Sequence, residues 1–121
     1  MHLVPSERAH RRIIDGERAC VAIAALQDQP SIHQWSSRFS MLADPTRLKV
    51  LLCIKAAGPI SVSDLAVAAD LNDDTASQAL RHLRAGQAVC TEREGRIVRY
   101  RVADPVIEGL LERVTGASQT R

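Results

Sequence analysis

Residues 61–102 read SVSDLAVAADLNDDTASQALRHLRAGQAVCTEREGRIVRYRV, and this stretch decides the fold. Ser61 begins a predicted first helix, because a serine side chain can accept one of the free backbone amides at a helix start. That helix is short and apolar. A turn follows, and either Asn72 or Asp73 is expected to cap a second helix. Two helices joined by such a turn are typical of a helix-turn-helix motif.

A hairpin is predicted directly after the second helix. Residues 89–93 and 96–102 are rich in strand-forming side chains and flank Glu94-Gly95, where glycine tolerates the positive φ of a tight turn. A hairpin in this position forms a wing, at about 89–102, behind a recognition helix at about 73–86. The predicted fold class is therefore mainly α (α+β), a winged helix-turn-helix.

Charge is unevenly distributed along the chain. Residues 75–101 carry six arginines against Glu92 and Glu94, a local charge of +4, whereas the whole chain has a net charge of +2 and the remainder is therefore −2. A basic segment within an otherwise acidic chain is the pattern expected of a DNA-binding face. We therefore expect double-stranded DNA as a partner.

Four further helices are predicted outside this motif. They begin at Asp15 or Glu17, at Pro30-Ser31, at Asp44-Pro45 and at Asp104-Pro105. The third, which Gly58-Pro59 should end, is apolar nearly all round and is expected to be the central core helix. The last should be about ten residues long.

Apolar stripes on the N- and C-terminal helices predict a homodimer. On the last helix the stripe comprises Val106, Ile107, Leu110, Leu111 and Val114. These stripes exceed what a small winged helix needs to cover its own core, so we expect extra N- and C-terminal dimerisation helices. The alternative is that both stripes pack within one monomer. The expected organisation is a flexible arm at 1–14, the winged domain at 15–116 and a flexible tail at 117–121.

Composition excludes several classes of protein. The 121 residues suffice for one domain, and with 2% aromatic residues its core must consist of Ala, Leu, Val and Ile. No window approaches the roughly 18 apolar residues of a membrane span, and a cytoplasmic location is expected. Three widely spaced cysteines argue against a disulfide framework. No phosphate loop, paired carboxylates or nucleophile–histidine arrangement is visible, so an enzyme is not expected.

The second helix and the wing supply the candidate DNA-binding residues. Side chains near the N-terminus of a recognition helix enter the major groove, where Gln can bond adenine and Arg can bond guanine. The candidates for the groove are Thr75, Ser77, Gln78 and Arg81. His82 and Arg84 lie further along and are expected to touch phosphate.

Strand alternation sorts the wing side chains into two faces. Val98, Tyr100 and Val102 should point inward, whereas Arg99 and Arg101 should point outward with Ile97. The direction of Arg93 is open. Arg96 lies at the turn and is the leading candidate for a contact with the DNA backbone or minor groove. The alternative is a solvated arginine face that never meets DNA.

In one unbroken register over about 31–115, the chain resembles the ArsR/SmtB family of small dimeric repressors that sense metals, metalloids or redox signals. The resemblance is carried by MLADPTRL at 41–48, SVSDLA at 61–66, ASQALRHLR at 76–84, EGRIVRYR at 94–101 and AD at 103–104. It implies an operator-binding dimer that an inducer releases from DNA, usually repressing a metal exporter or a detoxification gene.

The resemblance does not extend to the family's metal sites. One such site uses two cysteines where this chain has Ser61 and Ser63, and serine is a poor ligand for thiophilic ions. In the other, Asp104 matches the first ligand. Val106 stands in place of the following histidine, and Ala117 and Thr120 fall near the positions of the remaining two ligands.

The remaining metal candidates are Cys20, His33 and Asp104, with His2, His10, Glu17 or Asp15 as further ligands. Thiolate with imidazole suits zinc, nickel or cobalt. The alternative for Cys20 is a small residue on an apolar helix face. Cys53 is most simply a core residue, and Cys90 most simply a strand residue.

Together these features predict a dimeric, sequence-specific repressor that a metal ion or related stress signal releases from its operator. The alternative is a winged-helix regulator of the same fold without a metal inducer, controlled by a partner protein or by redox state.

Overall fold

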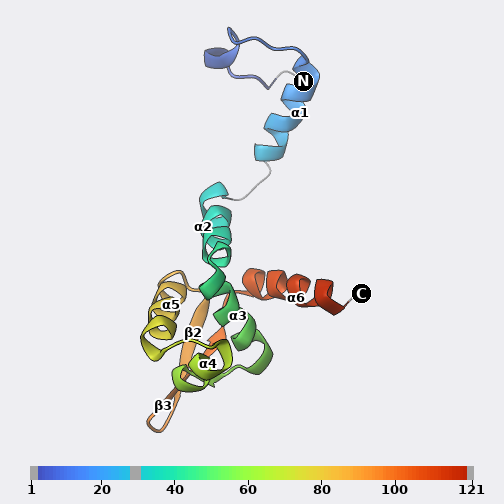
Figure 1. The fold of residues 1–121 in the computed structure, drawn as a ribbon. Coiled ribbons are helices and arrows are strands. Elements are labelled where there is room, and N and C mark those ends of the chain that lie inside the picture. The colour runs from blue at the N-terminus through green and yellow to red at the C-terminus, as the bar shows by residue number, and fades with distance from the viewer. Residues whose placement is uncertain (1–2, 28–30, 120–121) are drawn as a thin grey trace. The chain divides into compact units, whose positions relative to one another are not determined.

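The computed structural model describes residues 3–27 and 31–119, without the side chains of 117–119 (Figure 1). It divides into two compact units, Met1–Gln34 and Trp35–Arg121. The predicted arm at 1–14 and tail at 117–121 remain predictions. None of the helices in the described ranges is long and apolar enough to cross a membrane.

The first unit contains a short 3-10 helix, η1 (Ser6–Arg8), and the helix α1 (Gly16–Gln27). The Asp15 carboxylate accepts the backbone amide of Arg18 at 3.1 Å. Because this bond satisfies a free amide in the first turn, it explains why α1 begins where the sequence predicted.

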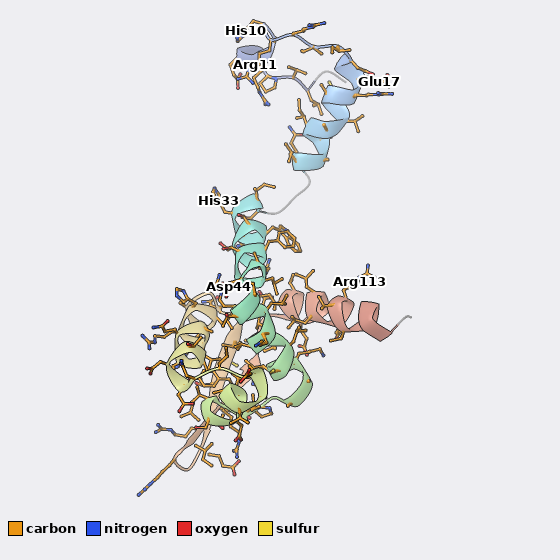
Figure 2. The ribbon with its side chains drawn as sticks, viewed as in Figure 1. His10, Arg11, Glu17, His33, Asp44 and Arg113 are labelled. Carbon is orange, nitrogen blue, oxygen red and sulfur yellow. The ribbon has the colours of Figure 1, made fainter. Side chains whose placement is uncertain are left out.

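The helices α2 (Ile32–Ala43) and α3 (Pro45–Ala57) follow. Ser31 caps α2 through the amide of Gln34 at 3.1 Å, and Asp44 caps α3 through the amide of Arg47 at 2.9 Å. Figure 2 labels Asp44 at the point where α2 ends and α3 begins. Both predicted helix starts are confirmed.

Helix α3 is the centre of the second unit, as predicted. Its Val50, Leu51 and Ile54 are buried, and it contacts α4, α5, α6 and β3. The buried cluster around it also contains Leu65, Ala79, Leu80, Leu83, Ala88, Val89, Ile107 and Leu111. Cys53 packs against this cluster, which supports its interpretation as a core residue.

The helix-turn-helix consists of α4 (Val62–Ala69) and α5 (Asp73–Ala85). The Ser61 hydroxyl accepts the amide of Asp64 at 3.3 Å, which confirms the predicted cap of α4. Asn72, rather than Asp73, caps α5, because its side-chain oxygen accepts the amide of Thr75 at 2.8 Å.

The strands β1 (Ile60–Ser61), β2 (Val89–Glu94) and β3 (Ile97–Val102) form an antiparallel sheet in the order β1-β3-β2. Figure 1 shows the β2–β3 hairpin projecting beyond α4 as a wing. Glu94 is opposite Ile97, so the turn residues are Gly95-Arg96 and not Glu94-Gly95. The predicted turn was one residue early, because Gly95, with φ +62°, occupies the first of the two central turn positions.

The last helix, α6 (Pro105–Gln119), is longer than the predicted ten residues. Asp104 begins it by accepting the amide of Val106 at 2.9 Å. Ile107 and Leu111 are buried against α3, whereas Val114 is 43% exposed. Part of the predicted stripe therefore packs within the monomer, and part of it is left uncovered.

Candidate nucleic-acid interface

Helix α5 presents a polar outer face to solvent. It buries Ala76, Ala79, Leu80 and Leu83, which recur at spacings of one, three and four residues. Gln78, Arg81 and His82 lie on the opposite side and are exposed, whereas Thr75 and Ser77 are half-buried at its edges. The candidate groove residues are therefore placed together on one accessible surface. Arg84 is also exposed, towards the same edge as Ser77.

Asp74 also lies on this outer face, and the sequence reasoning missed it. It is exposed, and it precedes Gln78 by one helical turn. A carboxylate there can accept a hydrogen bond from the amino group of cytosine, although it repels phosphate. The spacing of four residues between Asp74 and Gln78 indicates that the two share a helix face. Asp73 and Asp74 also stabilise the start of a helix, and this second role made the first easy to overlook.

The two faces of the wing follow from its register. Residues directly opposite one another share a face, so Arg93, opposite Val98, lies on the side of Tyr100 and Val102. Tyr100 and Val102 pack against the core, as predicted. Arg93 is on this same inward side, but it lies nearer the tip of the wing, where its side chain is exposed to solvent.

The outer face of the wing is partly neutralised by its own carboxylates. Arg99 Nη1 is 3.3 Å from Glu94 Oε2, and Arg101 Nε is 3.4 Å from Glu92 Oε2. Within 3–27 and 31–119, no carboxylate lies within ion-pair distance of the other four arginines of this segment, Arg81, Arg84, Arg93 and Arg96. The positive charge available to a ligand is therefore divided between α5 and the wing tip.

A hollow of about 510 Å³ separates the start of α4 from the wing. Ser61, which ends β1 and caps α4, and Ser63 on α4 line one side of it, and Arg96 and Arg99 line it from the wing. The serines stand at the positions of the two cysteines that the family resemblance implied as ligands. The Ser61 hydroxyl is already occupied by the amide of Asp64.

The three candidate metal ligands belong to different units: Cys20 and His33 to the first, and Asp104 to the second. His33 is exposed on the first turn of α2 (Figure 2). Across the described part of the chain, no three His, Cys, Asp or Glu side chains are grouped so that they could hold a metal ion. His2 and Thr120, and the side chain of Ala117, lie outside the described residues.

Cys20 is buried, with 8% of its surface exposed, and its Sγ accepts the amide of Leu3 at 3.1 Å. This environment fits the alternative interpretation of a small side chain on an apolar helix face. His10 and Glu17 are exposed, and Asp15 pairs with Arg18 at 3.2 Å.

Asp104 is engaged by an arginine. Arg38 Nε donates to its Oδ2 at 2.9 Å, and the two side chains are only 24% and 14% exposed. Burial raises the pKa of Asp104, but the hydrogen bond and charge of Arg38, with the amides of Val106 and Ile107, bring the pKa below its ordinary value. The carboxylate is therefore ionised and already paired.

Comparison with known proteins agrees with this geometry. Residues 42–89 match the family model described as a helix-turn-helix domain. Over 85 residues the chain is 34% identical to the HTH-type transcriptional regulator NmtR of Mycobacterium tuberculosis, covering 70% of each chain. This chain belongs to the ArsR/SmtB family.

Two other similar proteins support the assignment. The chain is 37% identical over 82 residues to the transcriptional repressor SmtB homolog of Synechocystis, covering 68% of this chain and 61% of that protein. It thus spans less than two thirds of that relative. The homodimeric winged helix-turn-helix DNA-binding domain of Mb0332 from Mycobacterium bovis superposes with a TM-score of 0.63 at 25% identity, covering 89% and 91% of the two chains.

Proposed function

We propose that this ArsR/SmtB protein is a dimeric transcriptional repressor that binds operator DNA through α5 and the wing. One observation carries the proposal: the exposed outer face of α5 and the wing tip hold four arginines without an ion-pair partner among the described residues. Arginines placed in this way can neutralise phosphates while other side chains of α5 read the bases.

The proposed contacts divide into two kinds. Base edges are read from the start and middle of α5, by Thr75, Ser77, Gln78 and Arg81. Phosphates are bound by His82, Arg84, Arg93, Arg96 and Arg99. Arg99 is the weakest member of this set, because its charge is shared with Glu94 at 3.3 Å.

Dimerisation is supported by apolar side chains that the second unit leaves uncovered. Phe39 on α2 is 54% exposed and Val114 on α6 is 43% exposed. Burying such side chains against a second copy is favourable, at about 25 cal/mol per Å². A two-fold dimer would place two copies of α5 on successive half-sites.

Selection of bound sequences from a random DNA pool tests the proposal. A dimer of this architecture should enrich an inverted repeat whose half-sites are separated by about one helical turn, 10–10.5 base pairs, or a multiple of it. Failure to enrich any sequence at low salt would contradict it.

For the effector we propose a thiophilic metal ion such as zinc, nickel or cobalt, with Cys20 as one ligand. The support is membership of a family in which such release is common, together with the chemistry of thiolate ligands. Binding would require the Cys20 thiol to give up its proton and its hydrogen bond from the Leu3 amide.

A second candidate is the same repressor without a metal effector, controlled by a partner protein or by redox state. A specific observation favours it: Asp104, the one carboxylate that matches a family ligand, is already bound by Arg38 at 2.9 Å. Operator binding titrated against zinc, nickel, cobalt and arsenite separates the two candidates, since only the first predicts release by one of these ions.

A further inference from the structure

A second hollow, of about 730 Å³, lies beside the C-terminal end of α5. Its walls come from the middle of α2, the first turn of α3, the end of α5 and the residues that follow α5. The polar side chains that line it are Ser36, Ser37, Ser40, Arg47, His82 and Gln87. None of the residues that line it is acidic, so the polar groups that face it are hydroxyls, a guanidinium, an imidazole and an amide.

Arg47 is fixed in position at this hollow. Its Nη2 donates to the Ser40 carbonyl at 3.2 Å and its Nε donates to the Met41 carbonyl at 3.4 Å. These bonds satisfy carbonyls in the last turn of α2 and hold the guanidinium beside the opening. Because Nη1 takes part in neither bond, it can still bind an oxygen ligand.

The hollow is continuous with the outer face of α5. His82 and Ala85 line both this hollow and a smaller one, of about 310 Å³, that Gln78 and Arg81 also line. A DNA strand that lies along the outer face of α5 and continues past Ala85 would therefore reach the hollow that Arg47 lines. A DNA strand whose bases are read by α5 carries a phosphate at each nucleotide along its edge.

We propose that this hollow binds the operator backbone, with Arg47, His82 and the α2 hydroxyls contacting phosphate oxygens next to the bases that α5 reads. The inference rests on the proposed function and adds a contact surface, from α2 and α3, outside the helix-turn-helix and the wing. The volume of about 730 Å³ and the open connection to α5 suit a strand of backbone better than a single small anion.

The substitution Gln87→Glu tests the proposal with little change of shape. It places a carboxylate in the hollow, and Gln27→Glu on the exposed end of α1 is the matched control. Because the new carboxylate would face phosphates of like charge, Gln87→Glu should weaken operator and random DNA alike, by about tenfold or more. The log–log salt slope of binding should fall by about 0.9 for each phosphate that the variant no longer neutralises.

Phosphate ethylation interference identifies the contact directly. Ethylation of a phosphate beside the read bases should block the parent and the Gln27→Glu variant, but should no longer matter for Gln87→Glu. If Gln87→Glu alters the unfolding temperature, Ser37→Glu on α2 supplies the same charge from the opposite wall.

Three results would overturn the proposal. One is equal DNA binding by Gln87→Glu, Ser37→Glu and the control. Another is an unchanged interference pattern. The third is saturable binding of inorganic phosphate in the hollow that leaves operator affinity unchanged, which would assign the hollow to a small anion. If an operator is selected but all variants bind it equally, only this inference fails. If the random pool yields no selected sequence, the proposed function itself fails.

Discussion

The guanidinium of Arg38 lies 2.9 Å from the carboxylate of Asp104, and this ion pair joins α2 to the start of α6. The same guanidinium stacks 5.3 Å from the centre of the Trp35 ring, which in turn stacks on Phe39. Asp104 also caps α6 through the amide of Val106. One carboxylate therefore begins a helix and fixes its position against another.

The pair predicts a specific loss of stability in acid. Because the folded pKa of Asp104 lies below the unfolded value of about 3.9, its contribution is complete above that pH and is lost as pH falls through the lowered value. Asp104→Asn should lower the free energy of unfolding by about 1–2 kcal/mol at pH 7. The difference from the parent should shrink below about pH 4, as measured by urea unfolding.

Asp15→Asn is the matched control, since Asp15 also caps a helix and pairs with an arginine, but Arg18 is 90% exposed. Asparagine caps as well as aspartate, so little change is expected there. Equal effects of the two substitutions would show that the Arg38 pair contributes nothing of its own.

The wing tip should contribute one phosphate contact. Arg96→Ala is expected to lower the log–log salt slope of operator binding by about 0.9 without changing sequence preference. Arg101→Ala removes the same charge from the same wing, but Arg101 pairs with Glu92 at 3.4 Å and should change the slope less. Fluorescence anisotropy across a salt series measures both, and identical slopes for the two variants would refute the distinction.

Asp74 should act on sequence preference. Asp74→Asn removes a negative charge from the outer face of α5, so binding to random DNA should strengthen. If the carboxylate accepts from cytosine, the preference for the operator should fall by about 1–3 kcal/mol. Asp73 is in the same helical turn but not on this outer face. Asp73→Asn should therefore leave the sequence preference unchanged. Parallel behaviour of the two variants would assign both residues only to helix stability.

Substitution of Cys20 tests whether the protein senses a thiophilic ion. Cys20→Ser should keep operator affinity and abolish release by metal, whereas Cys90→Ser on the wing should keep both. Release of the Cys20→Ser variant at the same metal concentration as the parent would remove Cys20 from the site.

The fold was predictable from the sequence where local chemistry determines it. Asp44-Pro45 and Ser61 mark helix starts because a side-chain oxygen three residues before an amide satisfies it, whatever the rest of the chain does. Alternation likewise placed Tyr100 and Val102 inward. The exact turn was missed by one residue, because a glycine at the first or at the second turn position gives nearly the same sequence pattern.

Contacts between residues far apart in the chain could not be predicted from the sequence. Arg38 and Asp104 are 66 positions apart, and neither carries a signal of the other. The two-residue strand β1 exists only because it pairs with β3 at Tyr100 and Arg99. The same reason explains why Arg47 was missed as a candidate: it reaches the hollow beside α5 only through the packing of α2, α3 and α5.

The most direct test of the central claim, that α5 reads operator bases, is the binding of Gln78→Ala to the selected operator and to random DNA at one salt concentration. Gln78 is exposed in the middle of the outer face. Its truncation should cost about 1–3 kcal/mol on the operator and little on random DNA, because it removes hydrogen bonds to a base edge. Arg84→Ala, which removes a side chain that we propose binds phosphate, should weaken both alike. Equal losses on both DNAs for Gln78→Ala would contradict the account.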